Sequence, residues 1–179
     1  MGFCIGVIGA GHWGQAHIRT LISLKREGLV ERLLVCDVDV EKLINLDPEV
    51  DATYTSWQQM LETNCIDLVA IVTPPKSHCQ LSTDLMNEGI DVLVEKPLGF
   101  SESQAAAVIA TSQSTGRSLY VGFLLRFHSG ILKAKSMVES GAIGSLHRLQ
   151  FIRHSTRTAP LQGDVIEALA AHAIDTVCS

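Results

Sequence analysis

Residues 3–14, F-C-I-G-V-I-G-A-G-H-W-G, decide the fold of this chain. An apolar, β-prone run from Phe3 to Ile8 leads into a G-x-G-x-x-G turn, and a helical pattern over residues 15–26 follows. A strand, a glycine turn and a helix in this order predict a dinucleotide site, with the free N–H groups of the first helical turn facing the phosphates. Taken alone, the motif also fits an ordinary strand–helix turn, so its surroundings must decide.

Each glycine of the turn has its own expected task. Gly9 allows a tight turn because it accepts backbone angles that a Cβ forbids. Gly11 leaves room for the pyrophosphate, and Gly14 lets the helix pack closely on the strand. His12 and Trp13 lie between the last two glycines and are candidate cofactor contacts, although His12, like His17 in the same helix, also fits ordinary helix surface or packing.

An acidic residue stands where a ribose ligand is expected. Asp37 follows a second apolar run, 32–36, and lies 23 positions after Gly14. Its carboxylate can accept hydrogen bonds from the adenosine ribose and would repel the 2′-phosphate of NADP. Residues 38–40, V-D-V, bring no cation, so the pattern favours NAD over NADP. The alternative is that Asp37 caps a helix over 40–46.

Strands and helices alternate from residue 3 to residue 123. This alternation predicts an α/β fold with a Rossmann-type, doubly wound parallel sheet, and an NAD-binding domain over 1–123. We expect strands at 3–8, 32–36, 52–54, 66–72, 91–94 and 118–123, and helices at 15–26, 57–63, 76–88 and 101–113.

The pattern changes after residue 123. A helix is expected at 128–139, an alternating half-exposed strand at 145–153, a loop at 156–163 and a helix at 165–177. One strand and one helix cannot bury a core, so residues 124–179 are expected to be the start of an incomplete α+β domain with an antiparallel sheet. The uncovered strand edge predicts self-association, and hence a homo-oligomer.

Composition narrows the class of protein. The net charge of −5 argues against a nucleic-acid partner. No apolar run approaches the roughly 20 residues of a membrane span, and the N-terminus does not resemble a signal peptide. Five scattered cysteines suggest neither a disulfide framework nor a zinc site, and the histidines show no metal-ligand spacing, so we expect a cytoplasmic protein without a metal.

Several short motifs add to the glycine turn and Asp37. They are T-P-P-K-S-H at 73–78, E-K-P at 95–97, G-F-L-L-R-F-H at 122–128 and H-A-I-D at 172–175. Together they resemble the Gfo/Idh/MocA oxidoreductases, in which an NAD(P)-binding Rossmann domain precedes a domain with an open antiparallel sheet. Residues 164–175 are most similar to the branch acting on UDP-N-acetyl-hexosamines and their uronic acids. On this comparison the chain is C-terminally truncated.

The resemblance implies roles for residues near the cofactor. Thr73, Pro74 and His78 would line the nicotinamide side of the cofactor wall. Glu95 and Lys96 would lie near the nicotinamide ring, where the Lys96 ammonium would bind the reacting hydroxyl and stabilise the developing alkoxide. Lys96 is otherwise an exposed charge at a strand end.

The substrate side rests on three further residues. His172 is the candidate general base, since an imidazole can take a hydroxyl proton at neutral pH. The family places an aspartate one turn before this histidine, but here that residue is Ala168, so a structural role for His172 is equally open. Asp175 would bind substrate or orient the imidazole. Arg126 would face the substrate or be a surface arginine.

Two functions follow. The first is an NAD-dependent dehydrogenase that moves a hydride between nicotinamide and a secondary alcohol of a sugar or nucleotide-sugar. The second is an NAD-binding module without catalytic activity, which depends on a partner or is a truncated relative; the missing carboxylate at Ala168 favours it.

Overall fold

A computed structural model describes residues 2–62, 65–152 and 170–178. The chain divides into two compact units, Met1–Gly122 and Phe123–Ser179, which we call unit 1 and unit 2 and describe separately. Among the described residues, every buried apolar side chain lies in unit 1.

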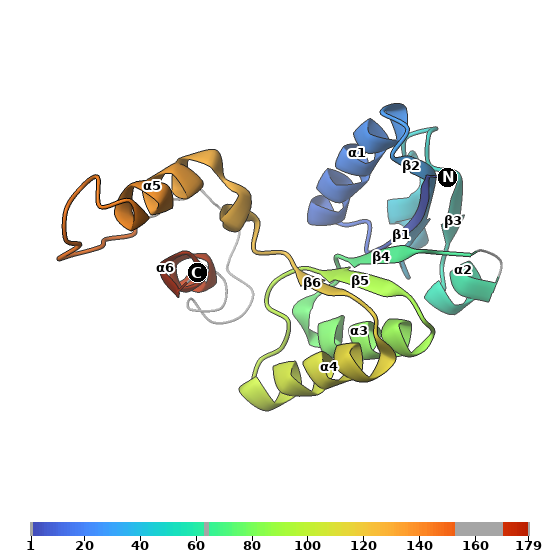
Figure 1. The fold of residues 1–179 in the computed structure, drawn as a ribbon. Helices are drawn as coiled ribbons and strands as arrows, with labels where there is room; N and C mark the ends of the chain where they lie inside the picture. Colours follow the sequence, from blue (N-terminus) through green and yellow to red (C-terminus); the bar gives the residue numbers. More distant parts are fainter. Residues whose placement is uncertain (1, 63–64, 153–169, 179) are drawn as a thin grey trace. The chain divides into compact units, whose positions relative to one another are not determined.

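Unit 1 is built on a six-stranded parallel sheet with the strand order β3-β2-β1-β4-β5-β6 (Figure 1). Parallel neighbours need crossover connections, and the helical segments between the strands supply them. The predicted Rossmann-type α/β fold is confirmed. The strands are β1 (Phe3–Ile8), β2 (Val30–Cys36), β3 (Ala52–Tyr54), β4 (Leu68–Ile71), β5 (Asp91–Val94) and β6 (Leu119–Val121).

The first helix begins earlier than the sequence pattern suggests. It starts at His12 rather than at residue 15, because Gly11 takes the cap position and its carbonyl accepts the Gln15 N–H at 2.9 Å. The glycine turn therefore runs directly into helical N–H groups. The helical segments of unit 1 are α1 (His12–Arg26), η1 (Val40–Leu43), α2 (Trp57–Glu62), η2 (Pro75–Ser77), α3 (His78–Asn87) and α4 (Glu102–Thr115), where η marks a 3₁₀ turn.

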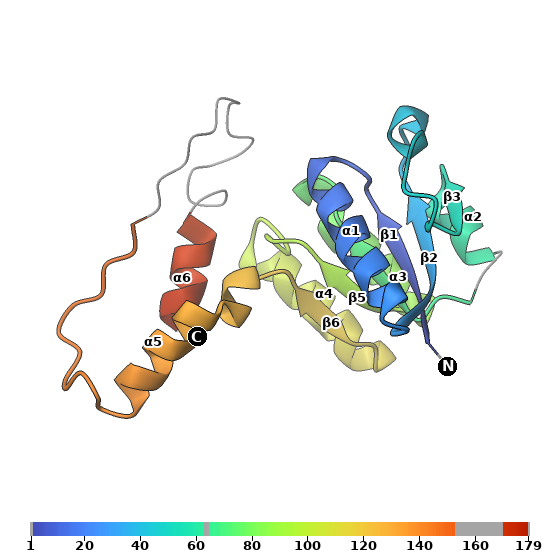
Figure 2. The same cartoon turned by 90° about the horizontal axis from the view of Figure 1, so that it is seen from above.

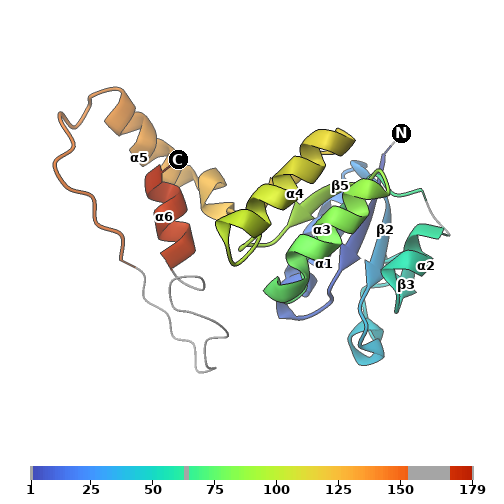
Figure 3. The same cartoon turned by 90° about the horizontal axis from the view of Figure 1, so that it is seen from below.

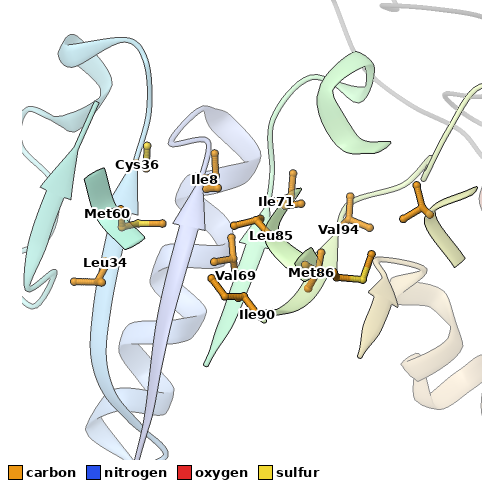
Figure 4. Packing of buried hydrophobic residues seen from close by; sticks show 12 residues of the cluster. Ile8, Leu34, Cys36, Met60, Val69, Ile71, Leu85, Met86, Ile90 and Val94 are labelled. Carbon is orange, nitrogen blue, oxygen red and sulfur yellow. The ribbon is translucent and has the colours of Figure 1, made fainter. Parts of the chain in front are cut away.

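Alternating side chains of the strands build a core on each face of the sheet. On one face, Met60 of α2, Leu85 of α3 and Val108 of α4 pack against strand residues such as Ile8 and Val69 (Figure 4). On the other face, apolar residues of α1 pack against strand residues that are adjacent in sequence to Ile8 and Val69 (Figures 2 and 3). Successive strand residues point to opposite faces, so both faces of the central strands are apolar, as a covered parallel sheet requires.

The register of the sheet aligns the carboxyl ends of its strands. Ile8 lies beside both Cys36 and Ile71, and Val94 lies beside both Ile71 and Val121. The strand order reverses between β1 and β4, and a ligand crevice is expected outside the carboxyl ends at such a point. Every residue that directly follows one of these strands is thus brought to one edge.

Unit 2 contains η3 (Leu124–Phe127), α5 (Ser129–Glu139) and α6 (Ala171–Cys178) among its described residues. The strand expected over 145–153 is not formed in its described part, 145–152. A strand needs partners for its backbone groups, and no second strand occurs in the described portion of this unit. The expected loop 156–163 and the first part of the helix 165–177 lie outside the described residues.

Two observations concern the chain as far as it is described. None of its described helices combines the length and the apolar character that a membrane crossing requires. All five cysteines are free thiols, of which Cys36 is buried at the end of β2.

Candidate functional site

The glycine turn between β1 and α1 has the close contacts that its sequence predicts. Gly9 has a φ of +104°, and a Cβ placed there would lie 2.5 Å from the carbonyl oxygen of Val72. A Cβ at Gly14 would lie 1.9 Å from the carbonyl oxygen of Gly9. The tight turn at Gly9 and the close helix–strand contact at Gly14 are therefore confirmed as conformational requirements.

Gly11 has the opposite environment. A Cβ at Gly11 would have no heavy atom of another part of the chain within 4 Å. This glycine is also the cap residue of α1, so the open space lies beside the first helical N–H groups, where a phosphate is favoured. His12 and Trp13 follow it, with their rings stacked at a centroid separation of 6.4 Å. The turn thus fits the pyrophosphate of a dinucleotide.

Asp37 is fixed at the end of β2, facing this turn. Its Oδ2 accepts the Ala10 N–H at 2.8 Å, its Oδ1 accepts the Asp39 N–H at 2.9 Å, and the residue is only 7% exposed. The 3₁₀ turn η1 is capped by Asp39, whose side chain accepts the Glu41 N–H. The alternative in which Asp37 is the helix cap is therefore excluded.

Lys42 is a cation near Asp37 that the sequence reasoning missed. Its Nζ lies 3.6 Å from Oδ1 of Asp37 and 3.4 Å from Oδ2 of Asp39. The charge of Asp37 is the main reason why the pKa of Lys42 is raised. Residues 38–40 contain no cation, but the turn of η1 brings Lys42 back to the carboxylate. A lysine three residues after an aspartate in a turn was the available signal.

The T-P-P-K-S-H segment connects β4 to α3. Thr73 Oγ1 and Ser77 Oγ are hydrogen-bonded at 2.6 Å, and Pro74 precedes η2. His78 is 1% exposed, and its Nδ1 and Nε2 lie 2.8 Å and 2.9 Å from the carbonyl oxygens of Pro97 and Thr73. Both ring nitrogens thus face the main chain, and His78 joins the segment after β4 to the segment after β5.

Glu95 follows β5, and its carboxylate is surrounded by hydrogen-bond donors of the protein. Oε1 lies 2.9 Å from Nε2 of His17, and Oε2 accepts the Lys96 N–H at 3.3 Å. Burial alone would raise the pKa of Glu95, but these bonds, with His17 the strongest, lower it. Sequence reasoning left His17 as ordinary helix surface or packing.

Lys96 is half-buried between Glu95 and Pro97, at the carboxyl end of β5. Unit 1 therefore brings most of the predicted residues to one edge of the sheet. These residues are Gly9, Gly11, His12, Trp13, Gly14, Asp37, Thr73, Pro74, His78, Glu95 and Lys96.

In unit 2, two predicted substrate residues bind each other. Nε of Arg126 donates to Oδ1 and Oδ2 of Asp175 at 2.9 Å and 3.0 Å, which raises the pKa of the arginine. The guanidinium also lies over the ring of Phe123, 5.5 Å from its centroid. His172 is buried on the same helix as Asp175. The Asp175 carboxylate thus anchors α6 to η3.

The described residues contain no candidate metal site. Within residues 2–62, 65–152 and 170–178, no group of three or more His, Cys, Asp or Glu side chains is placed to hold an ion.

Comparison with known families identifies the class. The family model for NAD-binding Rossmann-fold oxidoreductases of the Gfo/Idh/MocA type matches residues 3–123. The chain belongs to this oxidoreductase family, as the sequence motifs suggest. NAD is the cofactor of the family, and the predicted cofactor is confirmed at that level.

Individual relatives agree with this class. The chain is 28% identical over 145 residues to the rhizopine catabolism protein MocA of Rhizobium meliloti, covering 81% of the chain and 45% of the relative. It is 27% identical over 181 residues to inositol 2-dehydrogenase 3 of Saccharopolyspora erythraea, covering 97% and 52%. The crystal structure of myo-inositol 2-dehydrogenase from Lactobacillus plantarum superposes with a TM-score of 0.73 at 29% identity, covering 80% of the chain and 43% of that protein. The chain spans about half the length of these relatives.

Proposed function

We propose that this chain is an NAD-dependent dehydrogenase that oxidises a secondary alcohol of a cyclic polyol or sugar. The observation that carries the proposal is the alignment of the glycine turn, Asp37 and Lys96 at the carboxyl edge of one sheet. The relatives named as inositol 2-dehydrogenases support a polyol as the substrate class. A nucleotide-sugar is the narrower form of the proposal, suggested by the pattern of residues 164–175.

Unit 1 would bind the dinucleotide along this edge. The first turn of α1 would take the pyrophosphate, and Asp37 would accept the hydroxyl groups of the adenosine ribose. Thr73 and Pro74 would face the nicotinamide half, with His78 holding their segment from behind through the Thr73 carbonyl. Bound NAD supplies the acceptor for the hydride.

Lys96 and His172 would divide the work on the substrate. Oxidation removes a hydride from the carbinol carbon and a proton from its hydroxyl group, which leaves a ketone. The ammonium of Lys96 would stabilise negative charge on that oxygen while the hydride departs. His172 of unit 2 would take the proton, because a neutral imidazole is an effective base near pH 7. In this scheme Arg126 and Asp175 would act on substrate as a bound pair.

Oxidation of candidate substrates by the 179-residue chain tests the proposal. NADH formation would be followed with myo-inositol, scyllo-inositol and a UDP-N-acetyl-hexosaminuronic acid, using wild type and Lys96→Met. Lys76→Met is the matched control, since Lys76 is exposed on the T-P-P-K-S-H segment. We expect turnover with a polyol, a loss of at least about 100-fold in Lys96→Met, and none in the control.

A second function has one observation in its favour. Ala168 replaces the carboxylate that the family places beside the base, which favours an NAD-binding module without turnover. The same assay together with a calorimetric titration with NADH separates the two, because saturable NADH binding without oxidation of any substrate would support the module and contradict the dehydrogenase.

We further infer that the chain associates with itself and works in the reducing cytoplasm. Leu146, Leu149 and Ile152 are each more than half exposed, at 51%, 55% and 65%, which supports burial against another segment. The five free thiols fit a reducing compartment. Light scattering of the purified chain tests the first inference, and a monomer at high concentration would contradict it.

A further inference from the structure

We propose that Glu95 is a positioning residue that joins the phosphate-binding helix α1 to the nicotinamide side of the site, with His17 as its partner on that helix. The proposal rests on the proposed function in one respect only, the placing of nicotinamide near the end of β5. It gives a role to His17, which is not part of any sequence motif. It makes Glu95 a residue that binds other parts of the protein.

The first argument is the set of donors around the Glu95 carboxylate. His17 lies on α1, and its Nε2 is 2.9 Å from Oε1 of Glu95, while the Lys96 N–H binds the same carboxylate from the strand side. The carboxylate is 12% exposed, so these contacts, and not water, dominate its surroundings.

The second argument comes from Gly122, which follows β6. A Cβ at Gly122 would lie 3.1 Å from Cδ and from both oxygens of the Glu95 carboxylate. This is closer than ordinary van der Waals contact, so a Cβ there would push the carboxylate away by a few tenths of an ångström. Glu95 is therefore enclosed from α1, from its own strand end and from the residue after β6.

The third argument is the way the other end of the same segment is held. The His78 ring contacts the Pro97 carbonyl at 2.8 Å, and the Cys79 thiol donates to the Leu98 carbonyl at 3.1 Å. Both residues are at the start of α3. The E-K-P segment is thus fixed before Lys96 by α1 and after it by α3. This arrangement sets the main-chain position of Lys96.

These contacts predict an effect confined to one half of the cofactor. The adenosine and pyrophosphate half is held by the glycine turn and Asp37, which are fixed independently by the Ala10–Asp37 bond and the contact between Gly14 and Gly9. Loosening Glu95 should therefore weaken binding of the nicotinamide half. ADP-ribose is the matched probe, because it retains the adenosine, both riboses and the pyrophosphate of NADH but lacks nicotinamide.

The experiment is a calorimetric titration of the full chain with NADH and, separately, with ADP-ribose. The variants are Glu95→Gln, His17→Ala, His17→Gln and Gly122→Ala, with Arg19→Ala as the control from the exposed face of α1. We expect Glu95→Gln, His17→Ala and Gly122→Ala to weaken NADH binding by about threefold to tenfold, with ADP-ribose changed less than about twofold. His17→Gln keeps an N–H donor and should recover part of the loss, and Arg19→Ala should change neither ligand.

Three outcomes would overturn the proposal. They are an equal loss of both ligands in His17→Ala and Glu95→Gln, no loss of either ligand, and a wild-type chain that binds NADH no more tightly than ADP-ribose. Gly122→Ala keeps the test decisive if Glu95→Gln does not fold, because it moves the carboxylate without removing a donor. A chain that oxidises no polyol but shows the selective loss of NADH affinity would contradict the dehydrogenase and leave the role of Glu95 standing.

Discussion

Unit 1 and unit 2 are each stabilised by a different kind of interaction. Unit 1 buries apolar side chains on both faces of its sheet, and its predicted site residues are fixed by bonds to the main chain. In the described residues of unit 2 the only buried side chains are polar, namely His172 and Asp175. Burial of apolar area is the main favourable term in folding. The comparison therefore predicts that unit 1 is stable by its own core and that unit 2 depends on its ion pair.

The largest expected effect comes from a substitution in the glycine turn of unit 1. Gly14→Ala places a methyl group against the Gly9 carbonyl, a main-chain atom that cannot move away cheaply. We expect a loss of about 3 kcal/mol in the free energy of unfolding, measured with urea, and loss of NADH binding. Gly11→Ala is the matched control, because its Cβ meets open space. It should leave stability nearly unchanged and weaken NADH binding alone. Equal destabilisation by both changes would contradict the roles of the two glycines.

The next effect is confined to unit 2. Asp175→Ala removes the acceptor of three hydrogen bonds from Arg126, two from Nε and one from Nη2, and should loosen α6 from η3. We expect hydrogen exchange of the α6 amides to accelerate by about tenfold, while the amides of β1 and β4 keep their protection. Equal acceleration of exchange in both units would show that the two units do not unfold independently.

A smaller effect concerns an ion pair on unit 1. Asp51 accepts bonds from Lys25 Nζ and from the Leu33 N–H at 2.7 Å. Burial raises the pKa of Asp51, but these bonds outweigh it, so the pKa is lowered in the folded state. A lowered pKa adds stability above the ordinary aspartate value of about 3.9, and this stability is lost as the pH falls through the folded value.

Asp51→Asn tests that assignment. We expect the variant to unfold about 1 kcal/mol more easily than wild type in urea at pH 7. The difference should shrink as the pH falls below about 3.9. A difference that is constant from pH 7 to pH 3 would mean that the charge of Asp51 contributes nothing to the stability of unit 1.

The smallest expected effect concerns the preference of unit 1 for NADH over NADPH. Lys42 pairs with Asp37 and Asp39, so Lys42→Met leaves both carboxylates without this cation. We expect NADPH binding to weaken by about threefold through repulsion of its 2′-phosphate, with little change for NADH. Titration of both nucleotides measures the ratio, and Lys76→Met serves as the control. An unchanged ratio would remove Lys42 from the ribose site.

The same contrast explains what the sequence could predict. The strands and helices of unit 1 follow from local periodicity, and the roles of Gly9 and Gly14 follow from a short motif whose geometry depends on adjacent residues. The prediction of a strand at 145–153 was wrong. An alternating pattern indicates that one face of the segment would be buried, but a strand forms only where a partner strand is present.

Contacts between distant residues were the part that sequence could not supply. The pairing of His17 with Glu95 joins residues 78 positions apart, and Arg126 and Asp175 are separated by 49. His17 and Arg126 each fit a protein surface when taken alone. The proximity of Lys42 to Asp37 was missed for a local reason. Lys42 lies beyond residues 38–40, and a 3₁₀ turn brings it back to Asp37.

The central claim is that unit 1 forms a working NAD site from its glycine turn and Asp37. A calorimetric titration of the 179-residue chain with NADH and with NADPH tests this most directly. We predict saturable binding of both at one site per chain, with NADH bound at least about tenfold more tightly because the carboxylate of Asp37 repels a 2′-phosphate. Binding of neither nucleotide, or tighter binding of NADPH, would contradict the account.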